Sequence, residues 1–123
     1  MEASAYALND NIVTIESHGI RIGTLRLSGG QASSDLWRGI KADVTGKSVA
    51  LTTHVEATAF GTALLAGYGS GLYSDLVRTA KELGTVSETR RPRRAGALRY
   101  EENFKAFKDT YNLLRPKFEE LYS

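Results

Sequence analysis

The segment from Leu25 to Trp37 constrains the fold of this chain more than any other stretch. An alternating apolar run ends at the glycine pair Gly29-Gly30, a serine pair follows, and a helical apolar period begins at Leu36. This order predicts a strand, a tight glycine turn and a helix that is N-capped by a serine hydroxyl. Such a junction points backbone N–H groups and the positive end of a helix dipole at the space above the strand, where an anion or nucleotide can bind.

The same junction has a second interpretation, which is a plain turn without a ligand. The dinucleotide-binding fingerprint requires G-x-G-x-x-G after a strand, whereas this segment has the pattern G-G-x-x-S-S. Taken alone, the junction leaves both interpretations open.

Length and composition predict one soluble α/β domain. The chain has 123 residues, 41% of them hydrophobic and 24% charged, which suits a single modest core. No apolar run is long enough to cross a membrane, and the first residues lack the basic start and apolar core of a signal peptide. The absence of cysteine excludes disulfides and thiolate metal sites. We therefore predict a cytoplasmic protein that does not bind a membrane.

Positive charge is concentrated in the last third of the chain. Residues 85–123 carry nine Lys/Arg against six Asp/Glu, and the densest part is the run 90–94, Arg-Arg-Pro-Arg-Arg. A basic run can bind nucleic acid, but this one has no interleaved aromatic residue to stack a base, and its proline breaks a helix. We predict a solvated loop and no nucleic-acid partner.

Apolar spacing predicts an α/β fold with about five helices and a few short strands, of which two can be located. We expect these strands to be parallel. The expected helices are 2–17, 34–44, one starting near Glu56, 74–83 with Ser74 as its cap, and 98–122; the expected strands are 20–27 and 49–51. Gly61 lies inside the third helix, where glycine is unfavourable, so we expect the sheet or a neighbouring helix to pack closely there. In the fourth helix we expect Leu76, Ala80 and Leu83 to face inward. The glycines at 67, 69 and 71 predict a helix end and a turn.

The last helix, 98–122, is amphipathic and carries an aromatic stripe. The stripe alternates spacings of four and three and consists of Tyr100, Phe104, Phe107, Tyr111, Leu114, Phe118 and Leu121. Such a stripe is typical of a core or subunit contact. Pro116 removes one helical hydrogen bond, so we expect a kink or a restart there.

No convincing catalytic or metal centre can be identified from the residues. His18 and His54 have no second histidine or carboxylate at ligand spacing, so we predict no metal site. The carboxylates considered for acid–base chemistry are Asp35, Asp43, Glu56 and Asp75. We expect all four at helix starts or on exposed helical faces, where capping and solvation account for them.

Three stretches together resemble a known family. They are Ser28–Trp37, Ile40–Val44 with Gly46, and Glu56–Gly67. In sequence and spacing they closely resemble the C-terminal domain of the FGGY carbohydrate kinases, most of all the xylulokinase branch. The resemblance implies an actin-like ATPase fold, in which two RNase H-like domains close over ATP and a sugar. It also implies that residues 1–123 form a single partial C-terminal domain, the nucleotide-binding half.

The resemblance implies which residues bind the nucleotide. Gly29, Gly30, Gln31 and Ser34 would contact ATP or ADP, bound with Mg whose ligands lie outside this segment. Two positions depart from the family pattern: Gln31 stands where a third glycine is usual, and Ser33 where an arginine is common. The general base and the sugar-binding residues of the family lie upstream of this segment. We therefore expect no catalytic residue here and no catalysis by this chain alone, with a xylulose-like ketose or related polyol as acceptor.

Two further hypotheses remain open at this stage. The chain could be a non-catalytic product that no longer binds nucleotide usefully and self-associates as a homodimer through an uncovered sheet edge and the aromatic helix. It could also be a truncated product or a wrongly assigned reading frame.

Overall fold

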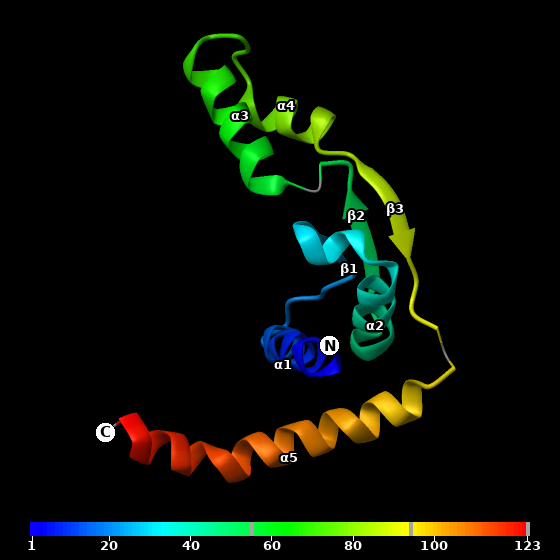
Figure 1. Ribbon diagram of the computed structural model, residues 1–123. Coiled ribbons are helices and arrows are strands. Elements are labelled where there is room, and N and C mark those ends of the chain that lie inside the picture. The colour runs from blue at the N-terminus through cyan, green and yellow to red at the C-terminus, as the bar shows by residue number, and fades with distance from the viewer. Residues whose placement is uncertain (55, 94, 123) are drawn as a thin grey trace.

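A computed structural model describes residues 1–54, 56–93 and 95–122 (Figure 1). Within these residues the chain forms five α-helices, one 3₁₀ helix and three strands, which confirms the mixed α/β fold. In chain order the elements are α1 (Glu2–Ser17), β1 (Thr24–Leu27), η1 (Gly30–Ser33), α2 (Asp35–Thr45), β2 (Ser48–Thr52), α3 (Ala57–Gly69), α4 (Leu76–Leu83), β3 (Val86–Arg90) and α5 (Ala97–Tyr122).

The three strands form one sheet in the order β1-β2-β3. β1 pairs in parallel with β2, as expected for a strand–helix–strand unit, and Leu25 lies opposite Val49. β3 pairs antiparallel with β2, with Thr89 opposite Ala50. β3 was not predicted from the sequence, and its last residue, Arg90, was expected in a loop. In the described residues β1 pairs with β2 alone, so its other edge carries no strand.

The helices occupy two ends of the sheet (Figure 1). α3 and α4 form a helical pair at one end, whereas α1, α2 and α5 lie together at the other. The main core lies between these last three helices. It is formed by the buried residues Ala5, Tyr6 and Val44, against which Ile40, Tyr100, Phe104 and Phe107 pack. Burial raises the pKa of the Tyr6 hydroxyl.

An ion pair connects α1 to the chain after α2. Glu16 Oε1 accepts a hydrogen bond from Lys47 Nζ at 2.6 Å and one from the backbone N–H of Ile22 at 3.1 Å. These two donors, the lysine first, lower the pKa of the Glu16 carboxyl below its usual value of 4.5. The folded state therefore favours the charged carboxylate.

Replacing Glu16 with glutamine should make the free energy of unfolding depend less on pH under acidic conditions. A carboxyl whose pKa is lowered by folding contributes stability above its ordinary pKa and loses it as the pH falls through the lowered value. In the wild-type chain this contribution should be present above pH 4.5 and disappear below it. Urea unfolding at several pH values should show a smaller loss for E16Q on acidification. An unchanged slope would mean that the Glu16–Lys47 pair does not form.

Two predictions for α3 and α4 are wrong: the close packing at Gly61 and the N-cap of α4. In the part of the chain that the structure describes, a Cβ added at Gly61 would meet nothing within 4 Å, so the predicted close packing there is wrong. Close packing occurs at Gly67 instead, where a Cβ would lie 2.8 Å from Cε1 of Tyr73. Ser74 does not cap α4; the cap is Asp75, whose Oδ1 accepts from the Arg78 backbone N–H at 2.9 Å.

The inward face predicted for α4 is only partly correct. Leu76 and Ala80 are half-buried, but Leu83 is 50% exposed. The predicted turn after α3 is confirmed, because the helix ends at Gly69 and Gly71 has a left-handed φ of 77°.

α5 is a single helix that projects beyond the rest of the molecule (Figure 1). It continues past Pro116, so the predicted restart is wrong. Near its start, Tyr100, Phe104 and Phe107 pack on the core, whereas the later members of the stripe are exposed. Between α1 and α5 lies an open groove of about 570 Å³. None of the described helices is both long and apolar enough to span a membrane.

Candidate functional site

The predicted strand–turn–helix junction is present at the carboxyl end of β1. Gly29 has a φ of 79°, a conformation that favours glycine, and it turns the chain into η1. Ser34 is the N-cap of α2, and its Oγ accepts from the Trp37 backbone N–H at 3.4 Å. Gly46 ends α2 with a left-handed φ of 65°. The local pattern of glycines and serines thus determines this junction.

The four predicted site residues lie within this one turn, in different environments. Gly30 is exposed, and a Cβ added there would meet no atom of the described residues within 4 Å. Ser34 is half-buried and uses its hydroxyl as the cap, while Gly29 makes the turn. Gln31 is exposed, and its Oε1 accepts from Lys41 Nζ at 3.3 Å. The space outside Gly30 is therefore open to a ligand.

Lys41 and Trp37 extend the turn along α2. They are four residues apart, and Lys41 Nζ lies 5.2 Å from the centroid of the Trp37 ring. Lys41 is partly buried, which lowers the pKa of its ammonium group. Lys41 was not among the predicted site residues, although its position one helical turn after the only tryptophan is a signal in the sequence.

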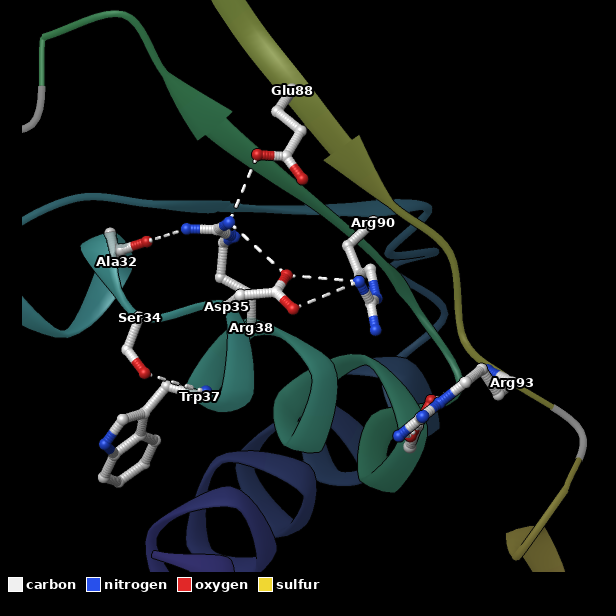
Figure 2. Close-up of polar contacts among 9 residues, drawn as sticks. Ala32, Ser34, Asp35, Trp37, Arg38, Glu88, Arg90 and Arg93 are labelled. Atoms are coloured by element: carbon white, nitrogen blue, oxygen red, sulfur yellow. Dashed lines mark hydrogen bonds and ion pairs between the residues drawn. The ribbon is translucent and has the colours of Figure 1, made fainter.

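Arg38 connects the turn to α2 and to β3 (Figure 2). Its Nη1 donates to the carbonyl of Ala32 in η1 at 2.7 Å, and its Nη2 lies 3.4 Å from Asp35 Oδ1 and 3.2 Å from Glu88 Oε2. Arg90, also on β3, donates to both Asp35 oxygens, at 3.1 and 3.5 Å. Asp35 therefore lies at a helix start, as predicted, but between two arginines.

The prediction that Asp43 lies at a helix start or on an exposed helical face is wrong, because its carboxylate is buried and paired with Arg93. Its side chain is 2% exposed and accepts three hydrogen bonds from Arg93. The backbone N–H of Arg93 donates to Oδ1 at 2.7 Å, and Nε and Nη2 donate to Oδ2 at 3.0 and 2.7 Å. These contacts raise the pKa of the Arg93 guanidinium.

The basic run is therefore only partly the solvated loop that was predicted. Arg91 is exposed, but Arg90 and Arg93 form ion pairs with α2, and Arg94 lies outside the described residues.

A cavity lies beside the turn, at the carboxyl ends of the two parallel strands. Its volume is about 240 Å³, and β1, the segment after β2, α3 and α4 all contribute to its lining. Ser28, immediately before the turn, lines it, whereas the four predicted residues are not in its described lining. His54 also lines it and stacks on Phe60 at 4.1 Å between ring centroids. Ligands of α/β sheets bind at this edge of parallel strands.

The remaining sequence candidates do not assemble into a site. His18 Nδ1 lies 2.8 Å from the Thr14 carbonyl at the end of α1, far along the chain from His54. Glu56 and Asp75 lie at the starts of α3 and α4. Among the described residues, no three histidine, aspartate or glutamate side chains are grouped so that they could hold a metal ion.

Comparison with known proteins identifies the family. Residues 1–70, which include the whole junction, match the model of the C-terminal domain of the FGGY family of carbohydrate kinases. The chain belongs to this family. The match covers α1 to α3 and thus all four predicted site residues of the FGGY domain.

The relatives of this FGGY chain are longer kinases. It is 43% identical over 65 residues to the autoinducer-2 kinase of Enterobacter sp. (strain 638), an alignment that covers 53% of this chain and 12% of that kinase. The xylulose kinase of Rhodospirillum rubrum has a similar structure, with a TM-score of 0.74 and 28% identity over 96% of this chain and 24% of that one. The glycerol kinase of Plasmodium falciparum with ADP shares the fold, with a TM-score of 0.61 and 18% identity over 94% of this chain and 22% of that one. The FGGY chain thus spans a quarter or less of each of these kinases.

Proposed function

We propose that this chain is the nucleotide-binding portion of an ATP-dependent sugar kinase and is not catalytic alone. The observation that carries the proposal is the turn between β1 and α2, with Gly29 at a positive φ that favours glycine, open space at Gly30 and a capped helix N-terminus. A backbone turn of this kind lets phosphate oxygens approach closely, and the dipole of α2 favours their negative charge.

Two further observations support nucleotide binding. The cavity beside Ser28 has about 240 Å³ at the carboxyl edge of the parallel strands, where a base or ribose could lie next to the turn. The glycerol kinase that shares this fold is described with ADP. We therefore assign Gly29, Gly30, Gln31 and Ser34 to contacts with ATP or ADP, with Mg bound by residues outside this chain.

The reaction that we propose for the longer kinase is phosphoryl transfer from ATP to a sugar hydroxyl. Catalysis of this transfer depends on positioning and on electrostatic stabilisation of the transferred phosphoryl group. This chain would hold one side of the nucleotide, and the rest of the kinase would supply the general base and the sugar site. We propose a xylulose-like ketose or related polyol as acceptor, supported by the likeness to xylulose kinases, with the enzyme in the cytoplasm. Residues 1–123 would form one partial domain, with the amphipathic helix 98–122 at its end.

A second candidate function is self-association without useful nucleotide binding. The far part of α5 exposes the later members of the stripe, Tyr111, Leu114, Phe118 and Leu121, whose exposed fractions are 55%, 44%, 47% and 68%. The outer edge of β1 carries no strand in the described residues. Sedimentation of the purified chain tests this candidate, because it predicts a dimer whose stability is lost when Phe118 is replaced.

Replacing Gly30 with valine should abolish nucleotide binding and leave the fold intact. An added side chain has open space in the free protein, so the far-UV circular dichroism should not change. The same side chain would occupy the space that a phosphate needs, so we expect Mg-ADP affinity to fall at least about tenfold. The intrinsic fluorescence of Trp37, the only tryptophan, reports binding from the first turn of α2.

Gly69→Val is the matched control for this experiment. A Cβ at Gly69, at the end of α3, also meets nothing within 4 Å, and the residue lies outside the turn. The control should bind Mg-ADP as the wild type does. If the Gly30 variant kept full affinity, the assignment of the turn to the nucleotide would be wrong; if it unfolded, Gly30 would be a structural glycine.

A further inference from the structure

Arg38 is a buried arginine whose contacts join three segments of the chain (Figure 2). Its side chain is 9% exposed, and its Nη atoms contact the Ala32 carbonyl in η1, Asp35 on α2 and Glu88 on β3. Its Nε is buried and has no hydrogen-bond partner among the described residues. Burial of a guanidinium is costly unless its charge and hydrogen bonds are compensated. The contacts to Ala32, Asp35 and Glu88 provide this compensation.

The contact with Ala32 acts directly on the turn. Ala32 is 1% exposed and lies between Gly30 and Ser34, and its N–H donates to the Gly29 carbonyl at 2.9 Å. Its carbonyl accepts from Arg38 Nη1 at 2.7 Å, the shortest of the contacts made by this arginine. A charged donor forms a stronger hydrogen bond than a neutral one. Arg38 therefore holds the middle of η1 against α2.

Two side chains of β3, Glu88 and Arg90, hold Arg38 and Asp35 in place. Glu88 and Arg90 are two residues apart, so they point to the same face of the strand. Glu88 pairs with Arg38, and Arg90 pairs with Asp35, which itself contacts Arg38. Acidic and basic groups alternate along this path from β3 to the turn. The segment that follows residue 70, beyond the family match, is thereby connected to the turn.

We propose that Arg38 is a positioning residue for nucleotide binding, held by Glu88 and acting through the Ala32 carbonyl. This inference rests on the proposed function of the turn. Direct contact with the nucleotide is not part of the proposal, because the side chain is buried and its Nη atoms already have partners. Its effect is to fix the η1 backbone in the conformation that the phosphates require.

The test uses three variants and two readouts. Arg38→Met keeps an apolar stem of similar length and removes every donor, while Asp35 and Glu88, which are 62% and 49% exposed, regain contact with water. Glu88→Gln weakens the hold on Arg38 without changing a buried residue. Arg115→Met removes an arginine from the exposed pair with Glu119 on α5 and serves as the matched control.

The readouts are amide hydrogen exchange of Ala32 and Ser34, and calorimetric affinity for Mg-ADP at a temperature where all variants are folded.

We expect amide exchange at Ala32 and Ser34 to rise about tenfold in R38M and less in E88Q, without faster exchange in α5. We expect Mg-ADP affinity to fall about tenfold in R38M, less in E88Q, and not at all in R115M.

Unchanged exchange at the turn in R38M and E88Q would overturn the inference, whether or not ADP binds. Faster exchange with wild-type affinity would also overturn it, because Arg38 would then be a structural residue only. If the wild-type chain does not bind Mg-ADP, the proposed function fails and the role of Arg38 in binding fails with it, whereas its hold on the turn is judged by exchange alone. If R38M does not fold, E88Q decides by the same two readouts.

Discussion

Replacing Arg93 with alanine is expected to lower the melting temperature of this chain by roughly 10 °C, because the exposed guanidinium of Arg93 is the charge partner of a buried carboxylate, that of Asp43. Arg93 gives three hydrogen bonds to Asp43, two of them from its side chain. Asp43 is 2% exposed, so without the guanidinium its carboxylate remains buried without a charge partner. Differential scanning calorimetry at neutral pH measures the effect.

The source of this loss can be separated with two further variants. Arg91→Ala removes an exposed arginine two residues away and should change the melting temperature little. Adding Asp43→Asn to Arg93→Ala removes the unpaired charge, so the double variant should be more stable than R93A alone. Equal losses for R91A and R93A would contradict the pairing of Arg93 with the buried Asp43 carboxylate and would favour a general effect of positive charge.

Replacing Phe107 with alanine is expected to destabilise the chain by about 3 kcal/mol and to release α5. Large-to-small changes at packed aromatic residues cost this much because contacts are lost and a cavity remains. The Phe107 ring lies 5.8 Å from that of Tyr6, which is 6% exposed and belongs to the core between α1, α2 and α5. Urea unfolding gives the free-energy change, and hydrogen exchange shows whether α5 loses protection before the rest of the chain.

Phe118→Ala is the matched control on the same helix. Phe118 is 47% exposed and lies in the projecting part of α5, so its loss should cost less than about 1 kcal/mol. A cost equal to that of Phe107→Ala would mean that the far part of α5 is packed in solution. The self-association candidate would then be favoured over an exposed helix end.

The sequence predicted best those features that depend on neighbouring residues. The glycine turn, α2 and the end of the first strand were correctly placed, because Gly29, Ser34 and Gly46 act on the backbone within a few residues. The start of that strand was predicted at residue 20, four residues before β1 begins. The cap of α4 was misplaced by one residue, since Ser74 and Asp75 are both good caps and only the backbone geometry selects between them.

Features that depend on distant partners could not be predicted. β3 is mostly polar and carries Glu88 and Arg90 on one face, so it lacks the apolar pattern of a strand, and its pairing partner β2 lies more than 30 residues earlier. Asp43 is on a helix and resembles a solvated carboxylate until Arg93, 50 residues later, reaches it. The crowded glycine was Gly67 rather than Gly61, which depends on where Tyr73 folds back.

The residues of the candidate site also fall into two groups, those predictable from local sequence and those that depend on tertiary contacts. The four residues of the turn were identified from local pattern and family resemblance, and their assignment to a nucleotide is a proposal. Lys41, close to Gln31, and the path from Arg38 to Glu88 are products of the tertiary structure. The pair Asp35 and Arg38, three apart at the start of α2, was the one local sign of this network.

Titration calorimetry of the wild-type chain with Mg-ADP tests the central claim most directly. We expect saturable binding, of about millimolar strength or tighter, that competes with Mg-ATP and disappears in the Gly30→Val variant. The absence of binding in a folded sample would contradict the claim that the Gly29–Ser34 turn forms a nucleotide site in this chain.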